Sequence, residues 1–380
     1  MKRKYVVVGV VLAVAPFIGV GAASGAVRSP LLTDGVLPLP PGFTSAGVVD
    51  LNDRGDVVAG GRADGPEQVV LWRGDSVSVL GGGSPTGLNN LGQVVGAEYV
   101  NGGSGQYERT PKLWQDGTTT VLAGPARSYV GTGDITDSGI SPVTYPNSTA
   151  GYHMENIGYW RGGAFSRLSA PTPGPHVSLS VVTENGTTAG SFLPMSGTGA
   201  YAFRCDATTC ARLAAYPGGT GEVRPVAAND NGVVVGNQNG VGLRWEGDQV
   251  AALPALTGAS DATVSNNRRA INNRGDIVGA SGGRATLWRD GAAVELGSPG
   301  GGQSAAVAVN DLGDVVGWSR TPQGQTRVFL WRAGRSYDLG TAGQTDATPV
   351  GLNNTGTVIG TATTSDYRSV PLRWTVRPPR

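Results

Sequence analysis

The sequence has few of the residues on which catalytic and metal sites usually depend. Among 380 residues there are only 2 histidines and 2 cysteines, and charged residues make up 15% of the chain. A zinc site needs several histidine, cysteine or carboxylate ligands at suitable spacing, and neither His153 nor His176 has such a set nearby in the sequence. No Gly-Lys pair occurs, which excludes a phosphate-binding loop of the Walker type. We therefore expect neither a metal site nor a cofactor.

Helical patterning is lacking too. The chain contains 62 glycines, and no sustained apolar repeat of 3.6 residues runs through it. Short runs of Val, Leu, Thr and Trp are instead bounded by Gly, Asn and Asp, which is typical of short β-strands joined by tight turns. The sequence predicts an all-β fold.

A basic surface is also lacking. Three cations lie in residues 1–4, followed by an apolar run over residues 5–20 and by small residues up to Ala26. This is the pattern of a secretory signal peptide. Cleavage after Ala26 would remove those three cations and change the formal net charge from +1 to −2, leaving no basic patch for nucleic acid or a membrane surface. We expect residues 1–26 to be a signal peptide and residues 27–380 to be a secreted, extracellular, monomeric protein.

Residues 27–380 contain eight similar units. Each unit has a polar turn that contains a glycine, followed by a short apolar strand, as in "INNRGDIVGA" and "VNDLGDVVGW". Seven steps between the first and last turn glycines average 43 residues. These glycines are Gly55, Gly92, Gly139, Gly186, Gly232, Gly275, Gly313 and Gly356. A strand ending in an aromatic residue follows each of them, near Trp72, Trp114, Trp160, Phe203, Trp245, Trp288, Trp331 and Trp374.

The turn motif has a simple physical explanation. The Asn or Asp that opens the turn can accept a backbone hydrogen bond, and the glycine can take the positive-φ position that closes a hairpin. Arg-Gly-Asp occurs at 54–56 and 274–276 in this motif, and at 73–75 in a second turn. Because other units place Leu, Ser, Asn or Thr before the glycine, we interpret the arginine as a tolerated polar residue and Asp276 as a polar strand residue of little consequence. The tripeptides are then turns and not adhesion motifs.

Each unit divides into four strands, named a to d in chain order. Four strands in about 43 residues is the pattern of a propeller blade. The last unit stops at its third strand, "PLRWTV", whereas an unpaired "DGVLPLPPG" at 34–42 precedes the first unit. A closed ring needs this phase shift, since the N-terminal segment can pair with the exposed edge of the last blade. We predict a single eight-bladed β-propeller over 27–380, closed by a strand from 34–42.

The units also resemble a known family. "AVNDLGDVVGW" with "VFLWRAGRSYDLG", and "AINNRGDIVGA" with "ATLWRDGAAVELG", are similar to the extracellular HAF-repeat family of secreted bacterial proteins. The similarity covers nearly all of residues 27–380. That family is defined by its repeats, so the resemblance implies a secreted repeat protein and assigns no catalytic residue.

Cys205 and Cys210 flank four residues in "FRCDATTCARL", where other units have their second turn. An even number of cysteines in an exported protein favours a disulfide. Facing positions across a hairpin can meet the geometry of the bond, and so short a loop limits its stabilisation to about 2 kcal/mol. We predict a disulfide with a structural function.

The alternation of strands places the a–b and c–d turns on one face of the ring, the short-turn face, and the b–c and d–a connections on the other, the long-loop face. Loops on a rigid scaffold often carry function, and the longest loops belong to the second to fourth units. Exposed tyrosines would suit sugars or peptides, so the expected partner is an extracellular glycan or protein. The candidate binding residues are Tyr99, Tyr107, Glu108, Tyr145, Tyr152 and His153.

Two functions remain open from the sequence. The first is a non-enzymatic binding module that uses the long-loop face. The alternative is an extracellular hydrolase or lyase that acts on glycans or peptides with carboxylates in the central channel. Two carboxylates about 5–10 Å apart in one pocket on the long-loop face would favour the enzyme.

Overall fold

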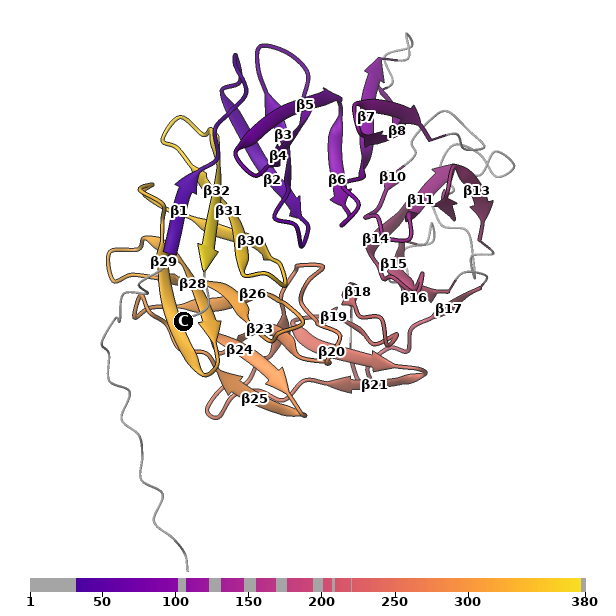
Figure 1. Ribbon diagram of the computed structural model, residues 1–380. Helices are drawn as coiled ribbons and strands as arrows, with labels where there is room; N and C mark the ends of the chain where they lie inside the picture. Colours follow the sequence, from indigo (N-terminus) through magenta and orange to yellow (C-terminus); the bar gives the residue numbers. More distant parts are fainter. Residues whose placement is uncertain are drawn as a thin grey trace, which may run out of the picture.

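The computed structural model describes residues 32–101, 107–122, 131–146, 155–168, 176–193, 201–206, 209–219 and 221–376. These residues form strands and no helix. The strands make eight four-stranded antiparallel sheets, which are arranged as the blades of a ring (Figure 1). The predicted all-β propeller of eight blades is confirmed.

In chain order, the first four blades are built from the following strands. They are β2 (Ser45–Leu51), β3 (Val57–Arg62), β4 (Gln68–Arg73) and β5 (Ser76–Gly82); β6 (Ser84–Leu88), β7 (Val94–Asn101), β8 (Tyr107–Gln115) and β9 (Thr118–Val121); β10 (Gly131–Thr132), β11 (Ile140–Pro146), β12 (Glu155–Arg161) and β13 (Ala164–Arg167); and β14 (His176–Val182), β15 (Thr188–Leu193), β16 (Tyr201–Cys205) and β17 (Cys210–Arg212).

The last four blades follow the same order. They are β18 (Val223–Ala228), β19 (Val234–Gln238), β20 (Val241–Glu246) and β21 (Gln249–Ala252); β22 (Thr263–Val264), β23 (Ile277–Ser281), β24 (Arg284–Arg289) and β25 (Ala292–Glu295); β26 (Ser304–Val309), β27 (Val315–Arg320), β28 (Thr326–Arg332) and β29 (Arg335–Gly340); and β30 (Thr348–Leu352), β31 (Thr357–Thr363) and β32 (Ser369–Val376) with β1 (Leu32–Val36).

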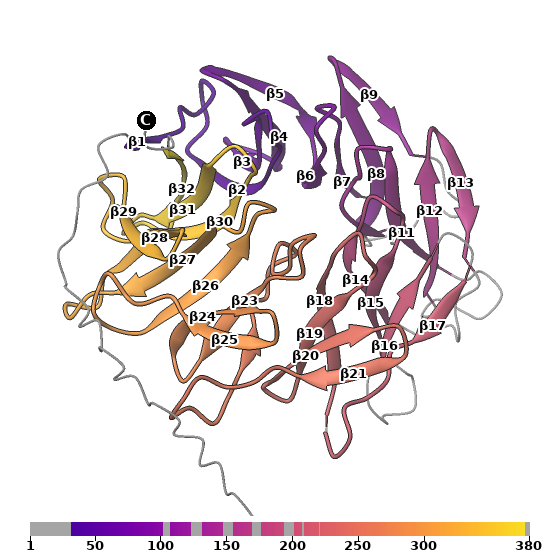
Figure 2. The ribbon, with the colours of Figure 1, turned by 60° about the horizontal axis from the view of Figure 1, so that its bottom comes forward.

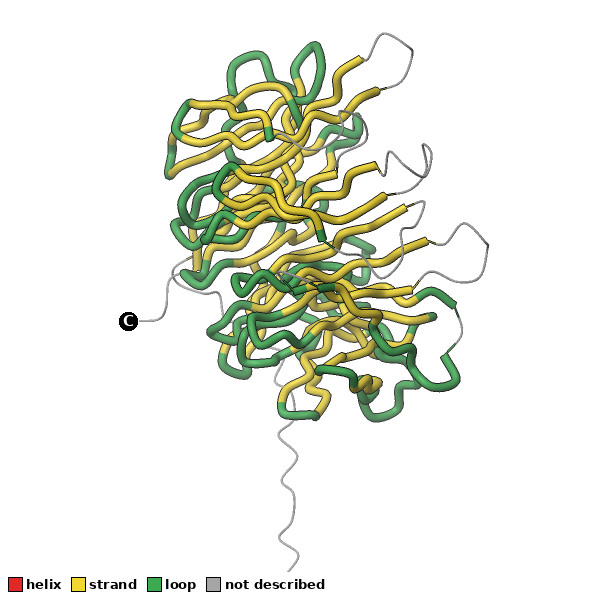
Figure 3. The backbone as a smooth tube through the Cα atoms, turned by 90° about the vertical axis from the view of Figure 1, so that its right-hand side faces the viewer, coloured by secondary structure: helices red, strands yellow, loops and turns green. Residues whose placement is uncertain are grey.

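The strands run between the two faces of the ring, and the connections gather on each face (Figure 3). The a strand of each blade lies next to the channel, and the d strand lies at the rim (Figure 2). All eight turn glycines have φ between +74° and +88°, a region that residues with a side chain rarely adopt. The prediction that these glycines close the turns is therefore confirmed.

The aromatic residue at the end of each c strand fills the space between neighbouring sheets. Seven of the eight are tryptophans and one is Phe203, and none exposes more than 9% of its surface. Trp72, for example, packs among residues of the first and eighth blades, and its indole N–H donates to the Pro38 carbonyl at 2.8 Å. Large apolar rings at one repeated position thus supply much of the core.

The ring is closed by β1, which pairs antiparallel with β32 from Leu32↔Val376 to Val36↔Leu372. In Figure 1 the indigo β1 lies beside the yellow β32. The predicted closure is confirmed, but its bounds were wrong. Within 34–42, only residues 34–36 lie in the strand, because the chain leaves the sheet after Leu37, whose N–H donates to the Pro371 carbonyl at 2.9 Å.

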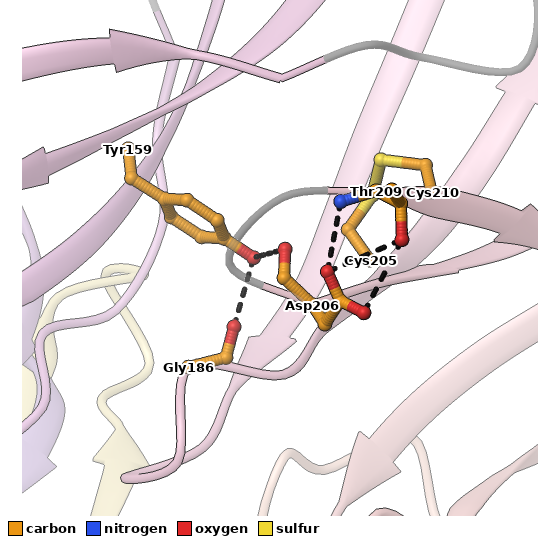
Figure 4. The surroundings of a disulfide bond; sticks show 6 residues. All are labelled: Tyr159, Gly186, Cys205, Asp206, Thr209 and Cys210. Carbon is orange, nitrogen blue, oxygen red and sulfur yellow. Dashed lines mark hydrogen bonds between the residues drawn. A yellow bond between two sulfur atoms is a disulfide. The ribbon is translucent and has the colours of Figure 1, made fainter.

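The two cysteines form the predicted disulfide. They are paired partners at the end of the β16–β17 hairpin, with their Cα atoms 3.9 Å apart. The hydroxyl of Tyr159, on the third blade, donates to the Gly186 carbonyl at 2.8 Å and to the Asp206 carbonyl at 3.4 Å (Figure 4). The bond therefore fixes a hairpin that contacts the neighbouring blade.

The closing strand can be tested with a cross-link. Gly35 and Arg373 are directly opposed across β1 and β32, and a Cβ added to Gly35 meets no atom within 4 Å. We expect the double variant Gly35→Cys, Arg373→Cys to form a disulfide under mild oxidation, seen as faster migration in non-reducing electrophoresis. Gly35→Cys with Thr375→Cys, which is two residues out of register, is the control. Equal cross-linking of both pairs, or of neither, would contradict the register.

Candidate functional site

The short-turn face carries a continuous belt of hydrogen bonds around the channel. In most blades the turn opens with an asparagine that first organises its own turn. The Oδ1 of Asn272 accepts the backbone N–H groups of Arg274 at 3.0 Å and Asp276 at 2.9 Å. Its Nδ2 then donates to the Asn310 carbonyl of the next blade at 2.8 Å. The first interaction was predicted, whereas the second connects neighbouring blades and was not.

The residue that follows the opening Asn or Thr of each turn completes the belt. Its backbone N–H donates to a side-chain oxygen of the corresponding residue in the next blade, at 2.6–2.9 Å, in all eight blades. The series runs Asp53, Asn90, Asp137, Glu184, Asp230, Asn273, Asp311, Asn354 and back to Asp53. The last link joins residues 301 positions apart, so the belt closes only because the ring does.

Inside this belt lies a polar cavity of about 230 Å³ at the mouth of the channel. Its acidic lining residues outnumber its basic ones by seven to two. The acidic residues are Asp50, Asp53, Asp134, Asp137, Glu184, Asp230 and Asp311, and the basic residues are Arg268 and Arg269. The two arginines decide what this cavity can do.

Arg268 and Arg269 belong to a four-residue insertion in the sixth blade. In the other seven blades, the a-strand residue eight positions before the turn glycine pairs with the b-strand residue five positions after it. In the second blade, for example, Ser84 pairs with Ala97 on either side of Gly92. In the sixth blade the partner of Ala280 is Thr263, twelve positions before Gly275. The chain consequently leaves the two-residue strand β22 and turns into the channel.

The insertion crosses the channel to blades that are not its neighbours. The Nδ2 of Asn267 donates to the Val350 carbonyl at 2.7 Å, and the Nη1 of Arg268 donates to the Thr86 carbonyl at 2.8 Å. The a strands are bulged at Thr86 and Val350, and a bulge frees backbone groups from the sheet ladder. Arg269 also donates to the Leu51 carbonyl of the first blade at 2.8 Å, so the insertion braces the eighth, second and first blades from inside.

A buried aspartate, Asp50, and a partly buried one, Asp134, converge on the insertion. Asp50, 2% exposed, lies 2.7 Å from Nη2 of Arg268 and 2.8 Å from Nη2 of Arg269, and its Oδ2 accepts the Leu88 N–H at 2.9 Å. Asp134 lies 3.0 Å from Nη1 of Arg268. The shared guanidinium thus separates two carboxylates that would otherwise repel each other.

The two aspartates respond oppositely to this environment. Burial tends to raise the pKa of Asp50, but Arg268 and Arg269 outweigh burial and hold that pKa below its usual value. Burial raises the pKa of Asp134 to about 6, with Asp50 acting in the same direction and Arg268 opposing it. Near neutral pH, Asp50 is a stabilised carboxylate and Asp134 an ionised group that burial disfavours.

On the long-loop face the candidate residues have different environments. Tyr99 is 51% exposed, and the guanidinium of Arg109 lies 4.9 Å from the centre of its ring. Tyr145 is 5% exposed, and its ring packs edge-on against Phe165 at 5.2 Å. The backbones of Tyr107 and Glu108 lie in β8, while Tyr152 and His153 lie outside the described residues. Ligand binding by these residues stays a prediction.

The interpretation of Asp276 as an inconsequential polar residue was wrong. Asp276 is 4% exposed and accepts hydrogen bonds from Arg289 at 2.6 and 2.8 Å and from Asn272 at 2.9 Å. Burial raises its pKa, yet the bonds from Arg289 and Asn272 bring the pKa below its usual value. This pairing is not visible in the sequence, because Arg289 lies at the end of the c strand, 13 residues after Asp276.

Comparison with known proteins adds the fold. No family model and no curated protein sequence matches the chain. Among solved structures it is similar to one of two prolyl endopeptidases, with 14% identity, a TM-score of 0.54, and 86% of this chain and 54% of that one covered. The propeller domain of the Trilobed protease from Pyrococcus furiosus follows, with 9% identity, a TM-score of 0.49, and coverage of 79% and 100%. A streptogramin B lyase has 12% identity, a TM-score of 0.46, and coverage of 91% and 98%. The likeness shows the fold alone.

Two further properties concern the described residues. They include no helix that is long and apolar enough to cross a membrane. Among the same residues, no group of three or more histidine, cysteine, aspartate and glutamate side chains is arranged to hold a metal ion.

The hydrogen bonds of buried Asp276 predict a loss of stability when it is substituted. In Asp276→Asn, Arg289 loses its bidentate carboxylate, and we expect the free energy of unfolding to fall by about 2 kcal/mol. Asp75→Asn is the matched control, since Asp75 belongs to the third Arg-Gly-Asp and its side chain is fully exposed. Urea denaturation of both variants measures the difference, and equal midpoints would contradict the buried network.

Replacing each of the two channel aspartates by asparagine is expected to change stability in opposite directions. The raised pKa of Asp134 means that its ionised form costs stability above about pH 6, a cost relieved as the pH falls from 6 towards 3.8. We expect Asp134→Asn to be at least as stable as the wild type at pH 7.5 and to lose that relative gain by pH 4.5. Asp50→Asn removes the partner of Arg268 and Arg269, so it should destabilise the protein at pH 7.5. Urea midpoints at both pH values decide, and parallel behaviour of the variants would refute the assignment.

Proposed function

We propose that this chain is a secreted, non-enzymatic binding module of the HAF-repeat type. It binds an extracellular glycan or protein through the long-loop face of the second to fourth blades. The disulfide supports export, because such bonds persist mainly in oxidising compartments.

The observation that carries this proposal is how the carboxylates in the channel are bound. A glycosidase needs one carboxyl group that donates a proton and a second that attacks or activates water. Of the seven acidic residues that line the cavity, Asp50 and Asp134 converge on one group, since both are bound to Arg268. Asp50 also binds Arg269 and the Leu88 N–H. Asp50 is held by two guanidinium groups and a backbone donor, so it is not free to attack a substrate or to activate water. Asp134 has a raised pKa, but it shares Arg268 with Asp50, and the cluster therefore favours bracing over hydrolysis.

The long-loop face offers a surface suited to recognition. β7 and β8 have 8 and 9 residues, and they stay paired out to Asn101↔Tyr107. This hairpin presents Tyr99, half exposed, with Arg109 against its ring. An exposed tyrosine supplies a rigid apolar ring with a polar end, and the guanidinium adds hydrogen-bond donors in a fixed plane. Such a pair suits the faces and hydroxyls of sugars as well as peptide carbonyls.

The test is a glycan and peptide array probed with residues 27–380. We expect one class of ligand to bind, and Tyr99→Ala and Arg109→Ala each to weaken that binding about tenfold, the loss of one good interaction. Tyr367→Ala is the matched control, because Tyr367 is a 91% exposed tyrosine in the b–c connection of the eighth blade. A hit that both hairpin variants bind as strongly as the wild type would place recognition elsewhere.

The enzyme alternative is examined with the same hits. Each bound ligand is incubated with the protein and analysed by mass spectrometry for cleavage products. We expect none. Products that disappear in Asp50→Asn or Asp134→Asn would replace the binding module with the hydrolase or lyase.

A further inference from the structure

The two Arg-Gly-Asp turns of the a–b type carry a common cluster of charges on the short-turn face. In the first blade, Arg54 lies 2.9 Å and Arg73 3.9 Å from Asp56. In the sixth blade, Arg274 lies 3.2 Å and Arg289 2.6 Å from Asp276. In each cluster two guanidinium groups share one buried carboxylate; in the sixth blade Asp290 also lies close enough to act on Arg289.

These guanidinium groups remain accessible. The side chains of Arg54 and Arg73 are 50% and 44% exposed, and those of Arg274 and Arg289 are 51% and 34% exposed. The paired carboxylates are 9% and 5% exposed. Each cluster therefore presents donors to solvent while its own anion lies beneath them.

The next blade completes both clusters in the same way. A Cβ built on Gly92 would collide with the Nη2 atoms of Arg54 and Arg73, and one on Gly313 would collide with those of Arg274 and Arg289. Both guanidinium groups thus lie over a glycine, where a side chain would displace them. The residue before that glycine is a leucine in both cases, Leu91 or Leu312, 58% and 64% exposed.

A groove of about 790 Å³ runs beside the second of these clusters. Its charged lining residues are Arg274, Arg289 and Arg332, together with Asp314, which pairs with Arg332. Leu312 and Trp331 supply apolar surface. Trp331 is 9% exposed and lies beneath the guanidinium of Arg289, 5.8 Å from the centre of its ring.

The seventh blade provides an internal contrast. Its Asp314 binds a single arginine, Arg332, at 2.7 and 2.9 Å, and Leu312 stands where the Arg-Gly-Asp turns have their first arginine. One arginine at the end of the c strand is thus enough to pair the buried aspartate. Arg274 is additional to that structural need, because Arg289 already binds Asp276. In the first blade Arg54 hydrogen-bonds Asp56 at 2.9 Å, and Arg73, at 3.9 Å, is the more loosely held arginine.

We propose that these two clusters, Arg54/Arg73/Leu91 and Arg274/Arg289/Leu312, are equivalent sites for a carboxylate flanked by an apolar side chain in an acidic peptide segment. Two planar guanidinium groups match the oxygens of a carboxylate, and the leucine beside them favours a peptide over a polyanionic glycan, which has no apolar side chains to bury. The chain then has two binding positions on the short-turn face, apart from the long-loop face proposed above.

The test is isothermal titration of residues 27–380 with a capped peptide of alternating leucine and glutamate. We expect two equivalents to bind, with affinity that falls as salt rises. Arg54→Gln and Arg274→Gln should each reduce the stoichiometry to one, and the double variant should weaken binding at least about tenfold. The same peptide with glutamine in place of glutamate should not bind, and a sulfated oligosaccharide should bind less tightly.

Two further variants separate binding from folding. Leu91→Ser with Leu312→Ser leaves every ion pair intact and should also weaken binding, without a change in melting temperature. Arg244→Gln, which removes an arginine paired with Glu246 on the fifth blade, should have no effect. The proposal fails if the wild type does not bind the acidic peptide, if the double arginine variant binds it as well as the wild type, or if the sulfated oligosaccharide is preferred.

Discussion

The ring depends on one repeated interaction, the hydrogen bond from the backbone N–H of each turn to a side-chain oxygen of the next. Every blade contributes one donor and one acceptor, so a blade is satisfied only when both neighbours are present. The eighth link, Asn354 to Asp53, requires the two ends of the chain to meet. This constraint explains why the second turn position is Asp, Asn or Glu in every unit, since each carries an oxygen that can accept.

One of the two links between neighbouring turns is missing where the sequence departs from the motif. The third and fourth turns open with Thr136 and Thr183, which organise their own turns through a hydroxyl but have no amide to donate to the next blade. The Nδ2 of Asn185 donates to the Asp230 carbonyl at 2.6 Å instead. The Tyr159 hydroxyl joins the third blade to the fourth, and the Cys205–Cys210 bond fixes the outer hairpin of the fourth blade. Additional contacts are thus concentrated where the standard link is incomplete.

Most of the architecture could be predicted from the sequence because it rests on local chemistry repeated eight times. A glycine at positive φ, an aromatic residue at a fixed distance and a phase shift between the ends are each visible in one unit or by comparing units. The site could not be predicted to the same extent. Asp50 and Asp134 meet Arg268 from different blades, and Asp276 meets Arg289 across a sheet. The signal that was available is spacing, since the sixth unit has four extra residues before its turn.

One tripeptide illustrates why similar letters need not have similar functions. At 54–56 and 274–276 the glycine turns the a strand into the b strand, and the following aspartate is buried because it starts the b strand against the core. At 73–75 the glycine, φ +58°, turns the c strand into the d strand at the rim, and Asp75 is fully exposed. Arg73 nevertheless joins the cluster of Arg54, because the end of a c strand lies beside the a–b turn of the same blade. The charge pattern of the short-turn face thus arises from the geometry of a blade. Among the described residues, two arginines lie beside one aspartate where the a–b turn supplies an arginine in addition to the one at the end of the c strand.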